Sequence, residues 1–128
     1  MSELTKYTLE FPIQSSINIL YSRLSTPGGL SRWFADDIII TDKIFTFFWD
    51  DMGQKARLLK KKKNSFIRFK WEENETKEDY FEFCIQIDEI TSDVSLLITD
   101  FSLNAQDQEE QTALWKKQVE NLKGAIGS

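Results

Sequence analysis

The chain contains no histidine, and this restricts the chemistry that it can perform. Histidine is the usual general base at neutral pH and the commonest protein ligand of metal ions. Ser-His-Asp and Cys-His catalytic arrangements therefore cannot be built from this sequence. The "PGG" at 27–29 is too short to cradle a phosphate, and no nucleotide-binding glycine pattern occurs elsewhere. We expect no catalytic residues of these kinds, no metal site and no cofactor.

Cysteine and carboxylate side chains are the reactive groups that remain. Cys84 lies in the middle of a predicted strand with no evident base, so we interpret it as a small core or cavity residue. The adjacent pairs Asp36–Asp37 and Asp50–Asp51 have the residue type that favours turns. Because neighbours on a strand point to opposite faces, neither pair is expected to share a proton.

Three charged residues stand inside apolar strands and are candidate polar groups of a cavity: Asp100, Glu82 and Arg68. Burial of Asp100, in "LLITDFSL", would raise its pKa and make it a candidate functional group. Period-two alternation favours an outward Asp100 instead. The same two orientations are open to Glu82 and Arg68, which are also placed to pair across neighbouring strands.

The elements that must position these residues begin with a strand and two helices. Alternation over 6–14 predicts a first strand, and an apolar stripe over 17–24 predicts a helix. Pro27 is placed to begin a second short helix over 28–34, with Leu30, Trp33 and Phe34 packed inward.

The middle of the chain reads as consecutive strands, and its end as one long helix. Trp115, Val119, Leu122 and Ile126 form an apolar stripe on the predicted helix within 104–128. No segment between the strands is long enough for a crossover helix, so the sheet must be antiparallel. A single long helix covering a strongly curved sheet of about six to seven strands gives an α+β fold. The predicted strands after the short helices are 37–41, 44–50, 54–63, 65–73, 80–90 and 94–103.

Two motifs in this order of elements resemble the helix-grip fold of the START/Bet v 1-like (SRPBCC) superfamily. They are "INILYSRLSTPGGLSRWFADD" (17–37) and "ALWKKQVENLKGAI" (113–126), and the chain is most similar to the branch related to the activator of Hsp90 ATPase. The resemblance implies a single START-like domain over 1–128, of the small stand-alone bacterial kind. Its sheet would wrap on the C-terminal helix. It does not select a function, because the superfamily includes lipid carriers, cyclases, small-molecule sensors and co-chaperone modules.

The helix-grip fold implies a cavity between the concave face of the sheet and the long helix. Such cavities are common sites for apolar or amphipathic small molecules. A bulge or register slip would exchange inward and outward faces. The residues predicted to line the cavity are Trp33 and Phe34 near its entrance, Phe45, Phe47, Trp49, Phe69, Trp71, Phe83, Ile85, Leu97 and Phe101 from the strands, and Trp115, Val119 and Leu122 from the helix.

The charge distribution offers a different type of site. The net charge of −5 argues against general nucleic-acid binding, which needs a basic surface. The segment 53–70 holds eight Lys or Arg and no acid, whereas 72–110 holds thirteen acids and one Lys. Opposite charges on adjacent strands can simply stabilise the sheet, or the basic segment can dock an acidic partner. The lysines at 60–63 also suit a solvated strand end.

The remaining bulk features place the chain among cytoplasmic proteins. There is no apolar run of membrane-spanning length, no signal-peptide pattern and only one cysteine. We therefore predict non-enzymatic binding of a small hydrophobic or amphipathic ligand, or of a lipid, in the cavity. A protein-interaction module related to co-chaperones is the alternative, and a carboxylate-based enzyme is a third. Ligand identity and oligomeric state stay open.

Overall fold

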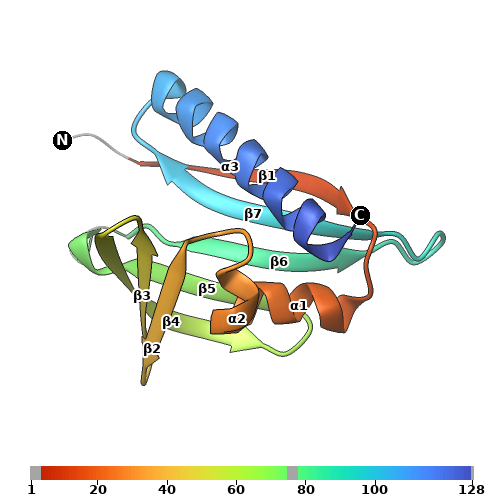
Figure 1. Cartoon of the computed structure of the whole chain (residues 1–128). Helices are drawn as coiled ribbons and strands as arrows, with labels where there is room; N and C mark the ends of the chain where they lie inside the picture. Colours follow the sequence, from red (N-terminus) through yellow and green to blue (C-terminus); the bar gives the residue numbers. More distant parts are fainter. Residues whose placement is uncertain (1–3, 75–77, 128) are drawn as a thin grey trace.

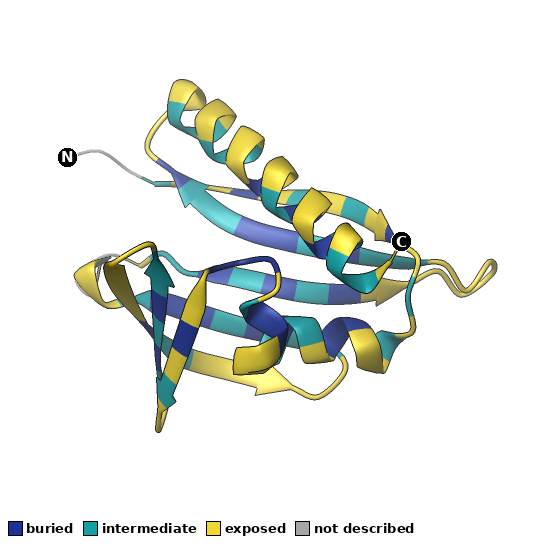
Figure 2. Ribbon diagram, viewed as in Figure 1, coloured by how far each residue is buried: buried dark blue, intermediate teal, exposed yellow. Residues whose placement is uncertain are grey.

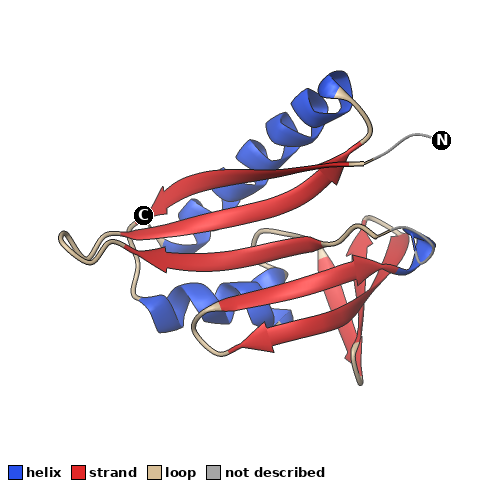
Figure 3. Cartoon of the chain, turned by 180° about the vertical axis from the view of Figure 1, so that it is seen from behind, coloured by secondary structure: helices blue, strands red, loops and turns tan. Residues whose placement is uncertain are grey.

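Strands with alternating hydrophobic residues form one antiparallel sheet. The computed structural model describes residues 4–74 and 78–127 of the chain. Within this described part the sheet has seven strands in the order β1-β7-β6-β5-β4-β3-β2. The sheet curves around helices that lie on one of its faces (Figure 1), and in the view from behind the strands lie in front of the long C-terminal helix (Figure 3). The predicted helix-grip-like α+β fold is confirmed. The strands are β1 (Thr5–Ile13), β2 (Asp37–Thr41), β3 (Ile44–Trp49), β4 (Met52–Lys62), β5 (Phe66–Trp71), β6 (Phe81–Ile87) and β7 (Val94–Ser102).

Tight turns join the consecutive strands from β2 to β5. Asp42, Asp50 and Asn64 have positive φ angles of 56°, 57° and 61° in these turns. Asp and Asn tolerate this left-handed conformation better than most residues, which explains their positions between the strands. The β4–β5 pairing also contains a bulge between Leu58 and Lys60.

Two short helices, α1 (Ile17–Ser25) and α2 (Pro27–Leu30), follow the first strand as predicted. Thr26 joins them: its hydroxyl donates to Ser22 O at 2.8 Å and accepts from Gly29 N at 2.9 Å. A Cβ on Gly29 would lie 2.1 Å from Ser22 O, so only glycine allows the two helices to approach this closely. The predicted short helix extended to 34, but α2 ends at Leu30, and turns carry the chain to β2.

The long helix α3 (Ala105–Ile126) begins at Asn104, whose side chain accepts from Asp107 N, and ends at the left-handed Gly127. It buries Trp115, Val119 and Leu122 against the sheet and leaves its opposite side exposed (Figure 2). Charged residues occupy that exposed side, as expected of an amphipathic helix.

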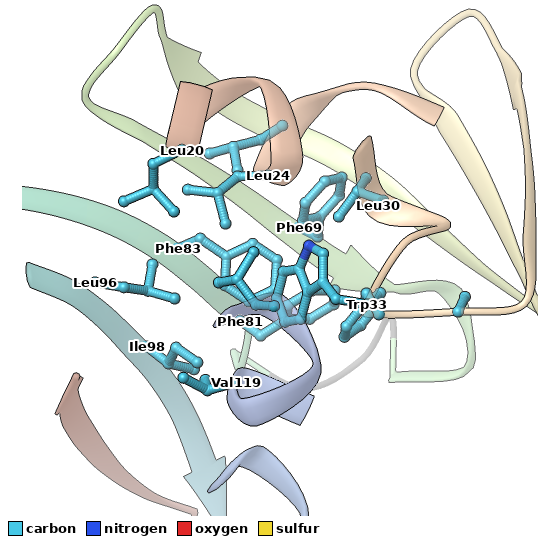
Figure 4. Close-up of a cluster of buried hydrophobic side chains, with 14 of the residues drawn as sticks. Leu20, Leu24, Leu30, Trp33, Phe69, Phe81, Phe83, Leu96, Ile98 and Val119 are labelled. Carbon is cyan, nitrogen blue, oxygen red and sulfur yellow. The ribbon is translucent and has the colours of Figure 1, made fainter. Parts of the chain in front are cut away.

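The core is aromatic, and it fills the space between the helices and the middle of the sheet. Phe47, Phe69 and Phe83 are completely buried. Leu20 and Leu24 of α1 lie close to Phe83 (Figure 4). Close packing of this kind leaves few voids between the buried side chains. We call the side of the sheet that carries this core the inner face. Its most buried strand residues are Ile13, Phe45, Phe47, Ala56, Ile67, Phe69, Phe81, Phe83, Leu96 and Ile98.

Strand β7 has the opposite alternation from the one predicted. Leu96 and Ile98 are completely buried on the inner face, so Leu97 points to the outer face. By the same alternation Asp100 points inward, and Phe101 outward against Tyr80 at 5.0 Å between ring centroids. Alternation in the sequence predicted Leu97 and Phe101 inward, and it left both orientations of Asp100 open. The structure satisfies the inward carboxyl by hydrogen bonding.

Candidate functional site: an open aromatic cleft

A cleft of about 740 Å³ opens to solvent at one end of the core. One wall is α3 between Gln111 and Asn121, and another is the segment 31–36 that follows α2. The ends of β3, β5 and β7 complete it with Trp49, Trp71 and Asp100. The available space therefore lies beside the filled core, rather than as an enclosed chamber under the helix.

Aromatic rings form the apolar surface of the cleft. Phe34 lies at the centre, with its ring centroid 5.5 Å from Trp49 and 5.9 Å from Trp115, on which it stacks at 14°. Trp71 lies 6.2 Å from Trp49 at an angle of 54°. Phe34 and Trp115 are buried, whereas Trp49 and Trp71 are half-buried and present part of their surface to the cleft.

Hydrogen bonds to one carbonyl hold these rings in place. The indole nitrogen of Trp49 donates to Phe34 O at 2.8 Å, and Gln118 Nε2 donates to the same oxygen at 3.3 Å. Trp33 is fixed separately, through its indole nitrogen and Arg23 O at 2.8 Å. The segment after α2 is thus bonded to β3, to α3 and to α1, which organises the cleft walls before any ligand arrives.

Asp100 is the polar group on the floor of the cleft. Its Oδ2 accepts from the indole nitrogen of Trp115 at 3.0 Å, and its Oδ1 accepts from Phe101 N at 2.8 Å. The pKa of the carboxyl is raised to about 6, mainly by burial and also by the nearby Asp79 and Asp107. The two hydrogen bonds lower this pKa, but by less than burial raises it. Asp100 therefore changes charge within the range of mildly acidic to neutral pH.

Tyr7 is the cross-strand partner of Asp100 on β1. Its hydroxyl donates to Gln111 Oε1 at 2.5 Å, and Gln111 Nε2 donates to Asp107 Oδ2 at 3.2 Å. Burial and the nearby Asp100 raise the pKa of the Tyr7 hydroxyl, so that it stays protonated and acts as a donor. This chain of contacts ties β1 to the first half of α3 behind the cleft.

Charged residues surround the mouth of the cleft. Arg32, Asp36, Glu73 and Lys117 line it and are exposed. Asp36 Oδ2 accepts from Asp50 N at 2.6 Å, which fixes the approach to β2. The mouth therefore carries both signs of charge, whereas aromatic rings and a carboxyl lie deeper.

The residues predicted to line a cavity separate into three groups. Trp33, Phe34, Trp49, Trp71 and Trp115 line the cleft, and Phe101 borders it although its ring packs against Tyr80. Leu97 lies on the outer face, and its predicted place in the cavity is corrected by the alternation of β7. The others are buried in the filled core: Phe45, Phe47, Phe69, Phe83, Ile85, Val119 and Leu122.

The three candidate polar residues also separate. Asp100 faces the cleft, but Arg68 and Glu82 alternate with inner-face residues and lie on the outer face. There Arg68 Nε donates to Glu82 Oε1 at 2.9 Å across β5 and β6, and its guanidinium lies 4.2 Å from the ring centre of Tyr80. Cys84 is half-buried on the same face, where burial raises the pKa of its thiol.

Sequence reasoning missed the polar residues of α3 that line the cleft, above all Gln111 and Gln118, and the bond of Tyr7 to Gln111 behind it. A signal was present on α3, because Gln111, Leu114, Gln118 and Asn121 recur at helical spacing beside the apolar stripe. Uncharged amides next to a buried stripe are placed to line a partly covered surface. Alternation over 6–14 places Tyr7 on one face with Leu9 and Ile13, but it gives no signal for the hydroxyl partner Gln111, which comes from the distant helix.

Fold and cleft together define a helix-grip-like α+β protein whose long helix and sheet border an open aromatic cleft. The family model described as the START-like superfamily domain matches residues 1–128, and the chain belongs to this family. A search of the curated proteins finds no match. Over the described residues, no helix combines the length and the apolar character needed to cross a membrane.

Solved structures agree with the family. The solution structure of BfR322 from Bacteroides fragilis is 39% identical, covers 96% of this chain and 90% of that chain, and has a TM-score of 0.70. The Aha1 dimer from Colwellia psychrerythraea is 19% identical with a TM-score of 0.78, over 95% of this chain and 96% of that chain. Bacillus halodurans BH1534 is 17% identical with a TM-score of 0.76, over 98% and 99% of the two chains. The last two likenesses concern the fold.

Proposed function

We propose that the chain binds a small amphipathic molecule in the aromatic cleft, as a cytoplasmic protein formed by a single domain. The observation that carries this proposal is the pairing of half-buried Trp49 and Trp71 with Asp100 in one cleft of about 740 Å³. That size and that combination of aromatic surface with few polar groups are typical of small-molecule sites. Membership of the START-like superfamily is consistent with this role.

The division between apolar and polar surface sets the expected orientation of the ligand. Trp49, Trp71 and Phe34 offer aromatic surface to an apolar body, whereas Asp100 and Gln118 offer polar atoms close to it. The exposed Arg32 and Lys117 then meet the part of the ligand that stays in water. A purely apolar molecule would leave the carboxyl of Asp100 covered without a new partner, which is unfavourable.

The test is an NMR titration of the ¹⁵N-labelled chain with two neutral amphipathic probes, indole-3-ethanol and 1-octanol. We expect saturable shifts of the indole N–H signals of Trp49, Trp71 and Trp115, with little change at Leu97 and Cys84 on the outer face. Trp71→Leu should weaken binding, because it removes one cleft wall. Phe66→Leu is the matched control, since Phe66 lies on the same strand but on the outer face. Absence of saturable shifts in the cleft with both probes would contradict the proposal.

A second candidate function is protein docking through β4. The lysines at 60–63 are all exposed at the end of this strand, and the fold is similar to that of the Aha1 dimer from Colwellia psychrerythraea. A second copy of the chain, which is acidic over 72–110, would be a complementary partner. Sedimentation equilibrium at rising salt tests this. Association should weaken with salt and with Lys→Glu substitutions at 60–63, but not with Lys116→Glu; a monomer at every salt concentration would exclude self-docking.

A further inference from the structure

The charges of the cleft are arranged by depth. Asp79 and Asp100 are half-buried, whereas Arg32 and Lys117 are exposed at the mouth. Asp79 is already paired, since Lys70 Nζ lies 3.1 Å from its Oδ1. Asp100 has no cation beside it among the described residues, and its two hydrogen-bond donors are both neutral. Of these two half-buried carboxyls, Asp79 therefore has a counter-ion in Lys70, whereas Asp100 has none among the described residues.

The carboxyl of Asp100 still has room to accept. An ionised carboxylate offers about four lone-pair positions, and each of its oxygens here receives one bond, from Phe101 N and from Trp115 Nε1. A half-buried carboxylate without a counter-ion is stabilised strongly by a cation that reaches it. The cleft gives a small molecule access to this carboxyl.

The aromatic walls favour the same sign of charge. The faces of indole rings attract cations, and Trp is the best of the aromatic side chains for this interaction. Trp49 and Trp71 lie 6.2 Å apart and are both half-buried in the cleft. They can contact an apolar body and also the positive group attached to it.

We propose that the ligand of the cleft is an organic cation, a protonated amine on an aromatic or apolar body. Its ammonium donates to Asp100, and its body lies against Trp49 and Trp71. This inference rests on the proposed function, because it names the class of ligand for the same cleft. The inference goes beyond the proposed function because it predicts that the cleft selects cations over neutral and anionic molecules of the same shape.

Protonation of Asp100 provides a switch for this selection. The other titratable groups that interact with its carboxyl are Tyr7 on β1, Asp79 before β6 and Asp107 on α3. Lys117 of α3 also lines the cleft, but it is exposed at the mouth. Because the pKa of Asp100 is about 6, the carboxyl is largely neutral at about pH 5 and ionised at about pH 7.5. An amine with a pKa similar to that of lysine stays protonated at both values.

The experiment compares three probes of matched shape by NMR titration: tryptamine, indole-3-ethanol and indole-3-propionate. At about pH 7.5 we expect tryptamine to bind roughly tenfold more tightly than the neutral alcohol, which corresponds to about 1.4 kcal/mol. The anion should bind most weakly. Lowering the pH to about 5 should remove the advantage of tryptamine without any substitution. Asp100→Asn should remove it at both pH values, because the amide keeps an oxygen for Trp115 but loses the charge.

Glu10→Gln is the matched control, since it removes one negative charge from the exposed outer face of β1 and should leave the preference unchanged. Equal binding of tryptamine and indole-3-ethanol would overturn the cation inference while leaving cleft binding intact. Failure of all three probes to shift the cleft signals would contradict both proposals. Tighter binding of indole-3-propionate would also overturn the inference and assign the selectivity to Arg32 and Lys117.

Discussion

The indole nitrogen of Trp115 donates to Asp100 Oδ2 at 3.0 Å, and this bond joins the long helix to strand β7. Trp115 also stacks on Phe34, so one side chain contacts the carboxyl on one side and the aromatic core on the other. A buried indole N–H needs a hydrogen-bond acceptor and a half-buried carboxyl needs a donor, and Trp115 and Asp100 supply these to each other. The position and the charge of Asp100 are therefore linked to the packing of α3.

Asp100 should make the protein less stable as the pH rises. Its pKa is about 6 in the folded chain and about 3.9 when unfolded, so between these values only the folded state holds the proton. The contribution of Asp100 to the free energy of unfolding is therefore most favourable below about pH 4 and falls as the pH rises to about 6. Above about pH 6 the free energy of unfolding is lower by about 3 kcal/mol than it is below about pH 4. Urea unfolding at a series of pH values measures this.

Asp100→Asn should flatten that pH dependence between about pH 4 and about pH 7. The slope is the readout here, because the amide also loses one of the two hydrogen bonds that the carboxyl accepts. Glu10→Gln should retain the wild-type slope. An Asp100→Asn protein whose stability still falls by the wild-type amount over this range would show that another group is responsible.

Trp115→Phe should raise the pKa of Asp100 above its wild-type value. The indole N–H stabilises the ionised carboxyl, and phenylalanine cannot donate this bond. The ¹³C chemical shift of the Asp100 carboxyl, followed against pH, gives the value directly. Trp33→Phe is the comparison, because it removes an indole that bonds to Arg23 O. An unchanged or lower pKa in Trp115→Phe would contradict this assignment.

The alternation of β7 can be tested with two adjacent residues. Ile98→Ala should lower the free energy of unfolding by about 2–5 kcal/mol, because it opens a space in the filled core. Leu97→Ala should cost about 1 kcal/mol or less, since the side chain is only half-buried on the outer face. Denaturant unfolding of both variants makes the comparison. A larger loss for Leu97→Ala than for Ile98→Ala would favour the alternation predicted from the sequence.

The junction of α1 and α2 should tolerate a methyl group at one glycine only. Gly29→Ala places a Cβ 2.1 Å from Ser22 O, so the helices must move apart, at a cost of about 1–3 kcal/mol. Gly28→Ala meets nothing within 4 Å and should be neutral or slightly stabilising in a helix. Thermal unfolding of the two variants distinguishes them; similar melting temperatures would contradict the close approach.

Element order, sheet direction and most strand faces were predictable because the apolar pattern of most segments is clear. Ile67 and Phe69 alternate with Arg68 and Lys70, and the stripe of Trp115, Val119 and Leu122 has helical spacing. The faces of β7 were predicted wrongly because Leu96, Leu97 and Ile98 are all apolar and both alternating faces contain polar residues. Alternation also left the orientation of Asp100 open, since its partner Trp115 comes from the distant helix α3.

The site was less predictable than the fold. Alternation identifies which side chains face the helices, but it does not say how far the core fills the space between them. Phe69 and Phe83 are completely buried in the core, whereas Trp49 and Trp71 line the open cleft. That distinction depends on the tilt of α3 and on the path of the segment after α2, which are set by long-range packing.

The measurement that tests the central claim most directly is the detection of contacts between a bound probe and the cleft. Isotope-filtered NOE spectra of the labelled chain with unlabelled indole-3-ethanol should show NOEs to Trp49, Trp71 and Phe34. They should show none to Phe66 or Leu97 on the outer face. NOEs confined to the outer face, or a saturating probe that leaves Trp49 and Trp71 without contacts, would contradict the assignment of the cleft as a ligand site.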